Sequence, residues 1–553
     1  MRITSKVIQN NSLSNINTNK ILQDKLNTQL ATKKKINRPS DDPVIAIRAL
    51  RLRTNVSQVT QYYDKNAPDA ESWMKITEDA LTTVTEVITD MIEQCQKGSS
   101  EKLKTTDRNT ILDALTSLRD EVYATGNADY AGRSVFTGYR TETTLKFVEE
   151  HTEKTYAITE QKSSSDIDVI KYISTGNLNT INESNFNTDA AYKDITEQDV
   201  TETSIYRMRL AYKDVDGVAA TGYSHGYVMD GDGNAETANT VSNFPQLQYY
   251  DGTGFTSIPE TCITSMTLSQ NPYEAMAAVD ATTDKVIIIE ETGEMLLSKS
   301  VYDKLMTAKD DPNTSADESE VRVTYQKSDW VKDDLKPEHY FACQDVSGTD
   351  AADDETAIDN KSIFYNREYL SGVVEKQVIE YDIGLNQSIR VNTTADEVFK
   401  HDIGRDTDDL VNALKELETI ENTVAKLEDM LKGYTEGTDN YNTVQNQLNA
   451  ANKARTFIAE KVQVMFEEGI TKMQSHLDTV NLAATNAGTR GKKLELIQNR
   501  LMSQKTNFET LQSENEDADV EEVAVQLSSA ELTYEAALMA TGKIMQTTLM
   551  NYI

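Results

Sequence analysis

Residues Glu514–Ile553 read ENEDADVEEVAVQLSSAELTYEAALMATGKIMQTTLMNYI. Apolar or small residues recur in this stretch at alternating spacings of three and four, which is the pattern of a coiled-coil seam. The seam positions are Val520, Val523, Leu527, Ala530, Tyr534, Ala537, Thr541 and Ile544, with Leu538, Met545, Leu549 and Tyr552 widening the stripe. Acidic residues fill the first turns and Lys543 lies near the end, so the charges complement the helix dipole. The pattern predicts one uninterrupted amphipathic helix, packed either on its own domain or against a partner.

The opposite end of the chain, residues 1–36, carries a similar but weaker stripe. Its apolar positions are Ile8, Leu13, Ile16, Leu22, Leu26 and Leu30. Several asparagines interrupt the stripe, and because asparagine is a poor helix former the segment alone is predicted to be largely disordered. It has seven basic residues and one acidic residue, a net charge of +6, whereas residues 514–553 have eight acids and one lysine, a net charge of −7. We expect the two ends to meet each other or a neighbouring subunit; a solvated basic tail is the alternative.

Length and composition limit the classes of protein that the chain can be. A length of 553 residues allows two to four domains, and 26% charged residues with a mean hydropathy of −0.55 fit long solvated helices. The sequence contains no run of eighteen apolar residues and no general secretory leader, so neither a membrane span nor that export route is expected. The net charge of −35 argues against nucleic acid or an anionic membrane as the main partner.

The search for catalytic motifs gives no candidate. The five histidines are scattered, without an HExxH pair, and the chain has no GxxxxGK[ST] phosphate loop, no GxGxxG turn and no GxSxG elbow. Cys95, Cys262 and Cys343 are far apart in the sequence and are expected to be unpaired. We therefore expect no catalytic residues and no cofactor, and a protein that is not an enzyme.

One stretch has a faint metal-binding pattern. Asp230, Asp232 and Asn234 alternate as the first ligands of a calcium loop do, but Ala235 and Val241 stand where such a loop needs glycine and glutamate. An ordinary aspartate- and glycine-rich surface turn accounts for the stretch equally well.

The order of patterns along the chain predicts an α+β multidomain protein. Five segments are expected: a basic segment at 1–43, helices at 44–147, a β-rich insertion of one or two domains at 148–375, helices at 376–513, and the final helix at 514–553. Helices, then strands, then helices imply that both chain ends share one long antiparallel bundle or coiled coil, with the β-rich region inserted in the middle. Both terminal segments are expected to be disordered before assembly.

Four motifs resemble the flagellin superfamily, and among its members the hook-associated proteins that join hook to filament. These are INRPSDDP at 36–43, YAGRSVFTGYRTETTLKF at 130–147, NQSIRVNTTADEVF at 386–399, and the C-terminal stretch quoted above. The resemblance covers roughly residues 1–147 and 375–553, and it rests on the order and position of the motifs.

The resemblance implies a structural component of the bacterial flagellum, secreted unfolded through the flagellar type III channel. Its partners would be copies of itself, the preceding hook-associated protein, flagellin and an export chaperone. The implied assembly interface is the terminal seam: Ile16, Leu22, Leu26, Leu30, Val520, Val523, Leu527, Tyr534, Leu538, Ile544 and Leu549. A filament subunit is the nearest alternative, although Pro39 and Pro43 depart from the flagellin pattern RINxAxDDAAG. A surface-binding protein acting through the inserted domain is a second alternative.

Overall fold

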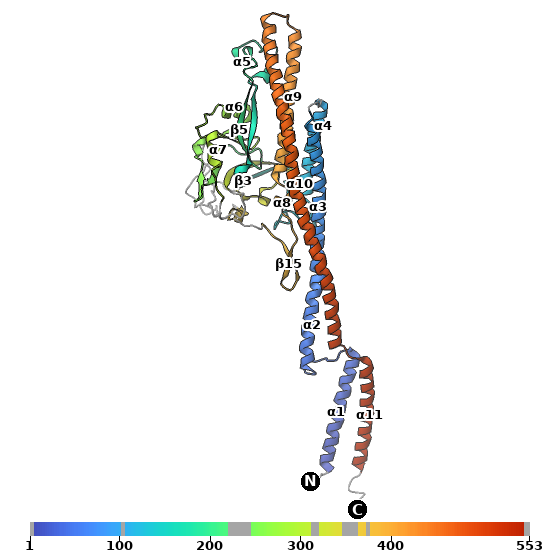
Figure 1. Cartoon of the computed structure of the whole chain (residues 1–553). Coiled ribbons are helices and arrows are strands. Elements are labelled where there is room, and N and C mark those ends of the chain that lie inside the picture. The colour runs from blue at the N-terminus through green and yellow to red at the C-terminus, as the bar shows by residue number, and fades with distance from the viewer. Residues whose placement is uncertain are drawn as a thin grey trace, which may run out of the picture. The chain divides into compact units, whose positions relative to one another are not determined.

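The computed structural model describes residues 5–100, 105–218, 245–310, 320–345, 363–371 and 376–546 (Figure 1). The candidate calcium ligands Asp230, Asp232 and Asn234 lie outside the described residues, as does Leu549. The chain divides into two compact units. Unit 1 comprises residues 1–71, 381–389 and 491–553, and unit 2 comprises residues 72–380 and 390–490.

Long helices form both ends of the chain, as the 3.6-residue periodicity predicts. Their bounds are α1 Ser5–Thr32, α2 Pro43–Gln61, α3 Ala67–Gly98, α4 Thr105–Thr125, α9 His401–Lys432, α10 Asp439–Glu516 and α11 Val520–Gln546. The start of α2 follows from its sequence: Pro43, whose missing N–H costs nothing there, is the first residue, and the Asp42 carboxylate accepts hydrogen bonds from the backbone N–H groups of Val44 and Ile45. A single π-turn, Tyr62–Asn66, lies between α2 and α3, just before Pro68.

The helix ends near the C-terminus differ from what the sequence pattern indicates. The final helix is not uninterrupted from Glu514: α10 ends at Glu516 and α11 begins at Val520, with Asp519 capping α11 by accepting from the N–H groups of Glu521 and Glu522. Although Gly491 and its flanking residues read in the sequence as a break between two helices, Asp439–Glu516 is one helix, α10. A helical glycine costs only about 1 kcal/mol, and buried Ala487 and Leu494 on either side of Gly491 hold the helix in place.

The helical part of unit 2 is built from α9, the first part of α10, and α3 and α4. Helices α9 and α10 form an antiparallel hairpin, and residues 433–438 join them (Figure 1). The helices approach closely where glycine replaces a side chain: a Cβ at Gly469 of α10 would lie 3.2 Å from Leu410 of α9 and 3.7 Å from Cys95 of α3. Cys95 is buried and, like Cys262 and Cys343, is a free thiol.

Two sheets make up the β-rich middle of unit 2. The five-stranded sheet has the order β4-β5-β10-β9-β8, with only β8 and β9 parallel among its pairs, and the six-stranded sheet has the order β13-β12-β3-β11-β6-β7. Their strands are β3 His151–Lys162, β4 Ile167–Ser174, β5 Thr201–Arg209, β6 Gln246–Tyr250, β7 Phe255–Ser257, β8 Ile263–Met266, β9 Val286–Ile289, β10 Glu294–Leu297, β11 Val321–Val331, β12 Ala342–Asp345 and β13 Ile363–Tyr365.

The short elements complete the middle of the chain. They are the hairpins β1 Asp129–Tyr130 with β2 Arg133–Ser134 and β14 Glu380–Gly384 with β15 Gln387–Arg390, and the helices α5 Ala190–Lys193, α6 Pro272–Ala277, α7 Lys299–Leu305 and α8 Ala395–Val398. The stretch KVIIIEETGEMLL at 285–297, whose apolar halves flank a glycine-containing turn, forms the hairpin β9–β10, with Gly293 at φ 61° in the turn. The predicted α+β class, with helical ends and a β-rich middle, is thus confirmed.

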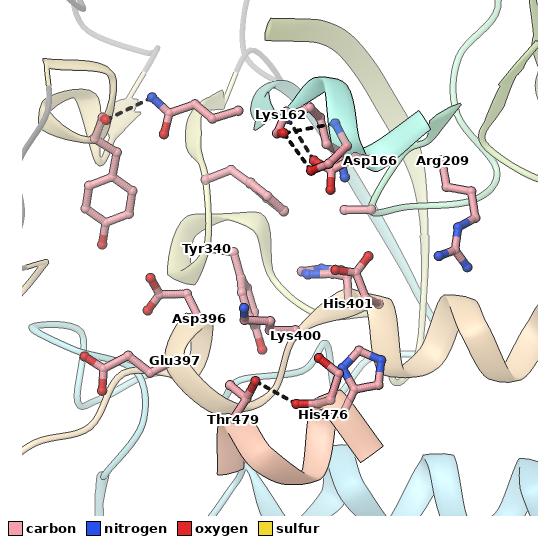
Figure 2. A pocket seen from close by; sticks show the side chains of 18 of the residues that line it. Lys162, Asp166, Arg209, Tyr340, Asp396, Glu397, Lys400, His401, His476 and Thr479 are labelled. Atoms are coloured by element: carbon pink, nitrogen blue, oxygen red, sulfur yellow. Dashed lines mark hydrogen bonds between the residues drawn. The ribbon is translucent and has the colours of Figure 1, made fainter. Parts of the chain in front are cut away.

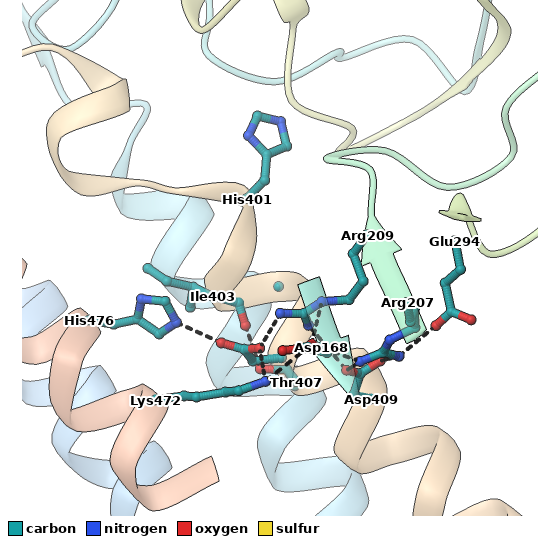
Figure 3. A network of polar contacts seen from close by, with 12 residues as sticks. Asp168, Arg207, Arg209, Glu294, His401, Ile403, Thr407, Asp409, Lys472 and His476 are labelled. Atoms are coloured by element: carbon teal, nitrogen blue, oxygen red, sulfur yellow. Dashed lines mark hydrogen bonds and ion pairs between the residues drawn. The ribbon is translucent and has the colours of Figure 1, made fainter. Parts of the chain in front are cut away.

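The middle of the chain is not detached from the helices, because both belong to unit 2. A cavity of about 1250 Å³ lies between the end of β3, the start of α9 and one face of α10 (Figure 2). Beside the cavity, a network of charged side chains ties β4, β5 and β10 to α9 and α10 (Figure 3).

The network is centred on two arginines of β5. Arg207 donates to Glu294 of β10 and Asp409 of α9, each at 2.8 Å. Arg209 lies 2.8 Å from Asp406, which also contacts Lys472 at 3.2 Å and His476 at 2.8 Å. Since these side chains are mostly buried, the network is a specific connection between the sheet and the helices.

Candidate assembly site

The two ends of the chain pack against each other in unit 1. Helices α1 and α11 lie side by side and run antiparallel (Figure 1). Their core is a small apolar cluster of Leu26, Val523 and Ala530, with Leu30, Ala518 and Leu527 packed against it. The α11 residues of this cluster include Val523, Leu527 and Ala530, which follow the spacing of four and three that the predicted seam has. The expectation that the two ends meet is confirmed within one chain.

Backbone hydrogen bonds join the two ends at the break before α11. The N–H of Lys35 donates to the carbonyl of Glu516 at 2.7 Å, and the N–H of Ala518 donates to the carbonyl of Lys33 at 2.9 Å. Residues 516–518 therefore pair with residues 33–35 rather than continuing the helix. This pairing is the physical reason why the predicted uninterrupted helix is broken here.

Opposite charges meet at the same place, in line with the charge asymmetry of the two ends. Arg53 of α2 binds Glu516 through two hydrogen bonds, at 2.7 and 2.6 Å, and Lys34 lies 2.5 Å from Asp517. The Glu516 side chain is only 3% exposed. The hydrogen bonds from Arg53, with Lys34 nearby, hold the pKa of Glu516 below its usual value of about 4.5, and the hydrogen bond from Lys34 lowers that of Asp517.

Acid is expected to weaken this junction. A carboxyl group whose pKa is lowered in the folded state contributes stability above its unfolded pKa, and the contribution is lost as the pH falls through the folded value. The α1–α11 pair should therefore open progressively below about pH 4.5, which amide hydrogen exchange in α1 would measure. Glu516→Gln should weaken the pair at pH 7 and flatten this pH dependence, whereas the exposed Glu495→Gln should change neither. If amide exchange in α1 depended on pH in the same way in Glu516→Gln and in the unmodified chain, the ionised Glu516 side chain would not be what stabilises the α1–α11 pair.

The predicted interface residues fall into three groups. Leu26 and Val523 are buried between the two helices, and Ile16, Leu30, Leu527 and Tyr534 are half-buried. Leu22, Val520 and Leu538 are exposed. The side chain of Ile544 and the whole of Leu549 lie outside the described residues. The stripe read from the sequence of α1 is therefore divided between a face that meets α11 and a face open to solvent.

The exposed apolar side chains of unit 1 extend beyond the stripes read from the sequence. Large apolar side chains are exposed on several helices of unit 1, among them Val7, Ile8, Leu13, Ile21 and Leu22 on α1, Val44, Ile47 and Leu50 on α2, and Val520, Val525, Leu532, Leu538 and Met539 on α11. Val525, Leu532 and Met539 are spaced seven residues apart, which was a readable signal of a second seam. We call this set the open faces of unit 1. Apolar surface of this extent is typical of an interaction site.

The N-terminal helices match a known family. Residues 3–141 fit the model described as the bacterial flagellin N-terminal helical region. Residues 3–141 are thus similar to the N-terminal helical region of flagellins. The resemblance seen in the motifs is confirmed for this part of the chain, which includes α1 and α2 with their open faces.

Curated relatives agree with this family. Flagellar hook-associated protein 3 of Salmonella typhimurium is 30% identical over 143 residues, which are 26% of this chain and 45% of that protein. The Escherichia coli protein of the same name is 30% identical over 144 residues, 26% of this chain and 45% of the relative. A flagellin of Clostridium tyrobutyricum is 29% identical over 122 residues, 22% of this chain and 32% of the relative. The match therefore spans about half the length of the hook-associated relatives.

Among solved structures, a flagellar hook-associated protein 3 from Legionella pneumophila aligns with 84% of this chain and 97% of its own length. The identity is 7% and the TM-score is 0.28. Because that score is below 0.5, this likeness carries no conclusion about function. Within the described part of the chain, no helix is long and apolar enough to cross a membrane.

Proposed function

We propose that the chain is a structural subunit of the bacterial flagellum that joins the hook to the filament. The observation that carries the proposal is that the flagellin region contains α1 and α2, the helices whose apolar side chains lie exposed in the single chain. Covering such faces with equivalent faces of neighbouring subunits would remove apolar surface from water, at about 25 cal/mol per Å². Assembly thus supplies the stabilisation that the single chain lacks.

The proposed partners follow from that position in the flagellum. They are copies of this chain, the preceding hook-associated protein on the hook side, flagellin on the filament side, and a chaperone during export. Secretion of an unfolded chain fits the weak α1–α11 pair, because the inward face of α1 also carries polar residues such as Asn19 and Gln23. A helix pair with few buried apolar contacts opens at low free-energy cost. We propose no enzymatic role; among the described residues, no three histidine, cysteine or acidic side chains are grouped to hold a metal ion.

The chain's location on the organelle tests the proposal. Immunogold labelling of isolated flagella from the source bacterium, with antibody raised against the β-rich middle, should give one band at the hook end. Labelling along the whole filament would instead identify a filament subunit, the alternative that the match to a flagellin keeps open. Absence of label from flagella that carry intact hooks and filaments would overturn both assignments.

A further inference from the structure

Helix α11 carries an apolar stripe on the side that faces away from α1. Val525, Leu532 and Met539 are 70%, 69% and 68% exposed, and we call them the second stripe of α11. Val525 and Leu532 each lie two residues after a member of the cluster that packs on α1, namely Val523 and Ala530. Two residues correspond to about 200° around a helix of 3.6 residues per turn. The α1–α11 pair of a single chain therefore leaves the second stripe uncovered.

Acidic side chains accompany the second stripe. Glu521 and Glu535 are exposed and lie four residues before Val525 and Met539, which places each glutamate on the same side of the helix as a residue of the stripe. In total α11 contains four glutamates and one lysine, a net charge of −3. None of the four glutamates forms an ion pair with a residue in the described part of the chain.

Helix α1 has the opposite charge. It contains three lysines and one aspartate, a net charge of +2. Lys6, Lys20 and Lys25 are exposed, and none of them forms an ion pair with another residue that the structure describes. The exposed Val7 and Ile21 lie among these lysines, and Ile21 shares one side of the helix with Lys25, four residues later. Helix α1 thus offers apolar surface beside unpaired cations, and α11 offers apolar surface beside unpaired acids.

The pairing of α1 with α11 inside one chain does not match these charges. The ion pairs that join the two ends lie at the break before α11, where Lys34 and Arg53 contact Glu516 and Asp517. Contacts between two copies through the same helix, α1 on α1 or α11 on α11, would bring like charges together, which is unfavourable. Contact between α1 of one copy and α11 of another brings opposite charges and two apolar surfaces together.

We propose that, in the assembly proposed above, on which this contact rests, the second stripe of α11 in one copy packs against α1 of the next copy. The α11 glutamates then face the α1 lysines of a second copy of this chain. Each copy uses α1 for one neighbour and the second stripe for the other, so the contact joins two different faces. Contacts of that kind build rings or helical arrays rather than closed pairs. The charges select which helices meet, and the apolar side chains supply the burial.

Charge reversal in a strain whose own gene is deleted tests this contact. One full-length chain carries Lys20→Glu with Lys25→Glu in α1, and another carries Glu521→Lys with Glu535→Lys in α11. Each reversed chain alone should lower the fraction of hooks that carry filaments at least about tenfold, because like charges then face each other between copies. The two reversed chains expressed together should restore filaments, since the α11 of each then meets an α1 of opposite charge on the other. All four changes in one chain should restore filaments as well.

The matched control is Lys332→Glu with Lys432→Glu, which changes the net charge by as much as the α1 reversal at positions 51% and 74% exposed in unit 2. It should leave filaments normal at equal export, and hydrogen exchange of the α1–α11 pair should be unchanged in both reversed chains. Normal filaments from either reversed chain alone would overturn the proposal. So would restoration only when all four changes share one chain, which means that the charges act within a chain, or no restoration at all, which means that the helices meet a different protein. Immunogold labelling reads the location of the chain separately, so the proposed function and this contact can fail independently.

Discussion

Replacing Arg207 with alanine is expected to destabilise unit 2 by about 3–5 kcal/mol, because breaking a buried ion pair leaves its acidic partners without compensation. Arg207 is 7% exposed at its side chain and contacts Glu294, Asp409 and Asp168 from three different elements. The loss would appear in the free energy of unfolding obtained from guanidinium titration. It would also appear as faster hydrogen exchange where β5 faces α9.

The control for this change is the exposed pair Lys432–Asp429. Its side chains are 74% and 82% exposed, so Lys432→Ala should change the free energy of unfolding by about 0–1 kcal/mol. If Arg207→Ala cost no more than Lys432→Ala, the charged network would not be what holds the sheet against the helices.

The second large effect is expected from Leu26→Asp in α1. Leu26 is 3% exposed in the cluster with Val523 and Ala530. The change removes the roughly 1.5–3 kcal/mol of a buried leucine and adds the cost of burying a carboxylate, so the α1–α11 pair should separate. Loss of helical circular dichroism and cleavage of both chain ends by limited proteolysis would measure it.

Leu22→Asp is the matched control, four residues earlier on the same helix. Leu22 is 45% exposed on the open face, so the carboxylate remains hydrated and the α1–α11 pair should stay intact. Equal protease sensitivity of the two variants would contradict the division of α1 into a face that meets α11 and an open face.

The sequence predicted the seam of α11 because burial there follows a regular spacing. Val523, Leu527 and Ala530 lie at the expected positions and face the basic end of the chain. The break at residues 517–519 could not be predicted from helical spacing, since it depends on backbone hydrogen bonds with residues 33–35, more than 480 positions away. Helical periodicity is a local signal, and this break is a tertiary one.

Other features lie beyond the reach of a single sequence for the same reason. Arg207 and Asp409 meet only because strand pairing in the middle of the chain and the start of α9 bring them together. Glycines such as Gly491 lower the helix propensity of α10, but burial of neighbouring side chains outweighs this effect. The second stripe of α11, in contrast, was visible as a seven-residue repeat that the first stripe concealed.

The central claim is that the open faces of unit 1 carry assembly, and Leu532→Asp tests it most directly. Leu532 is 69% exposed on α11, so the single chain should fold and be exported normally. In a strain whose own gene is deleted, electron microscopy should show hooks without filaments. Val148→Asp, at a 67% exposed position in the middle of the chain, should restore filaments fully. Normal filaments with Leu532→Asp, or their loss with Val148→Asp at equal export, would contradict the account.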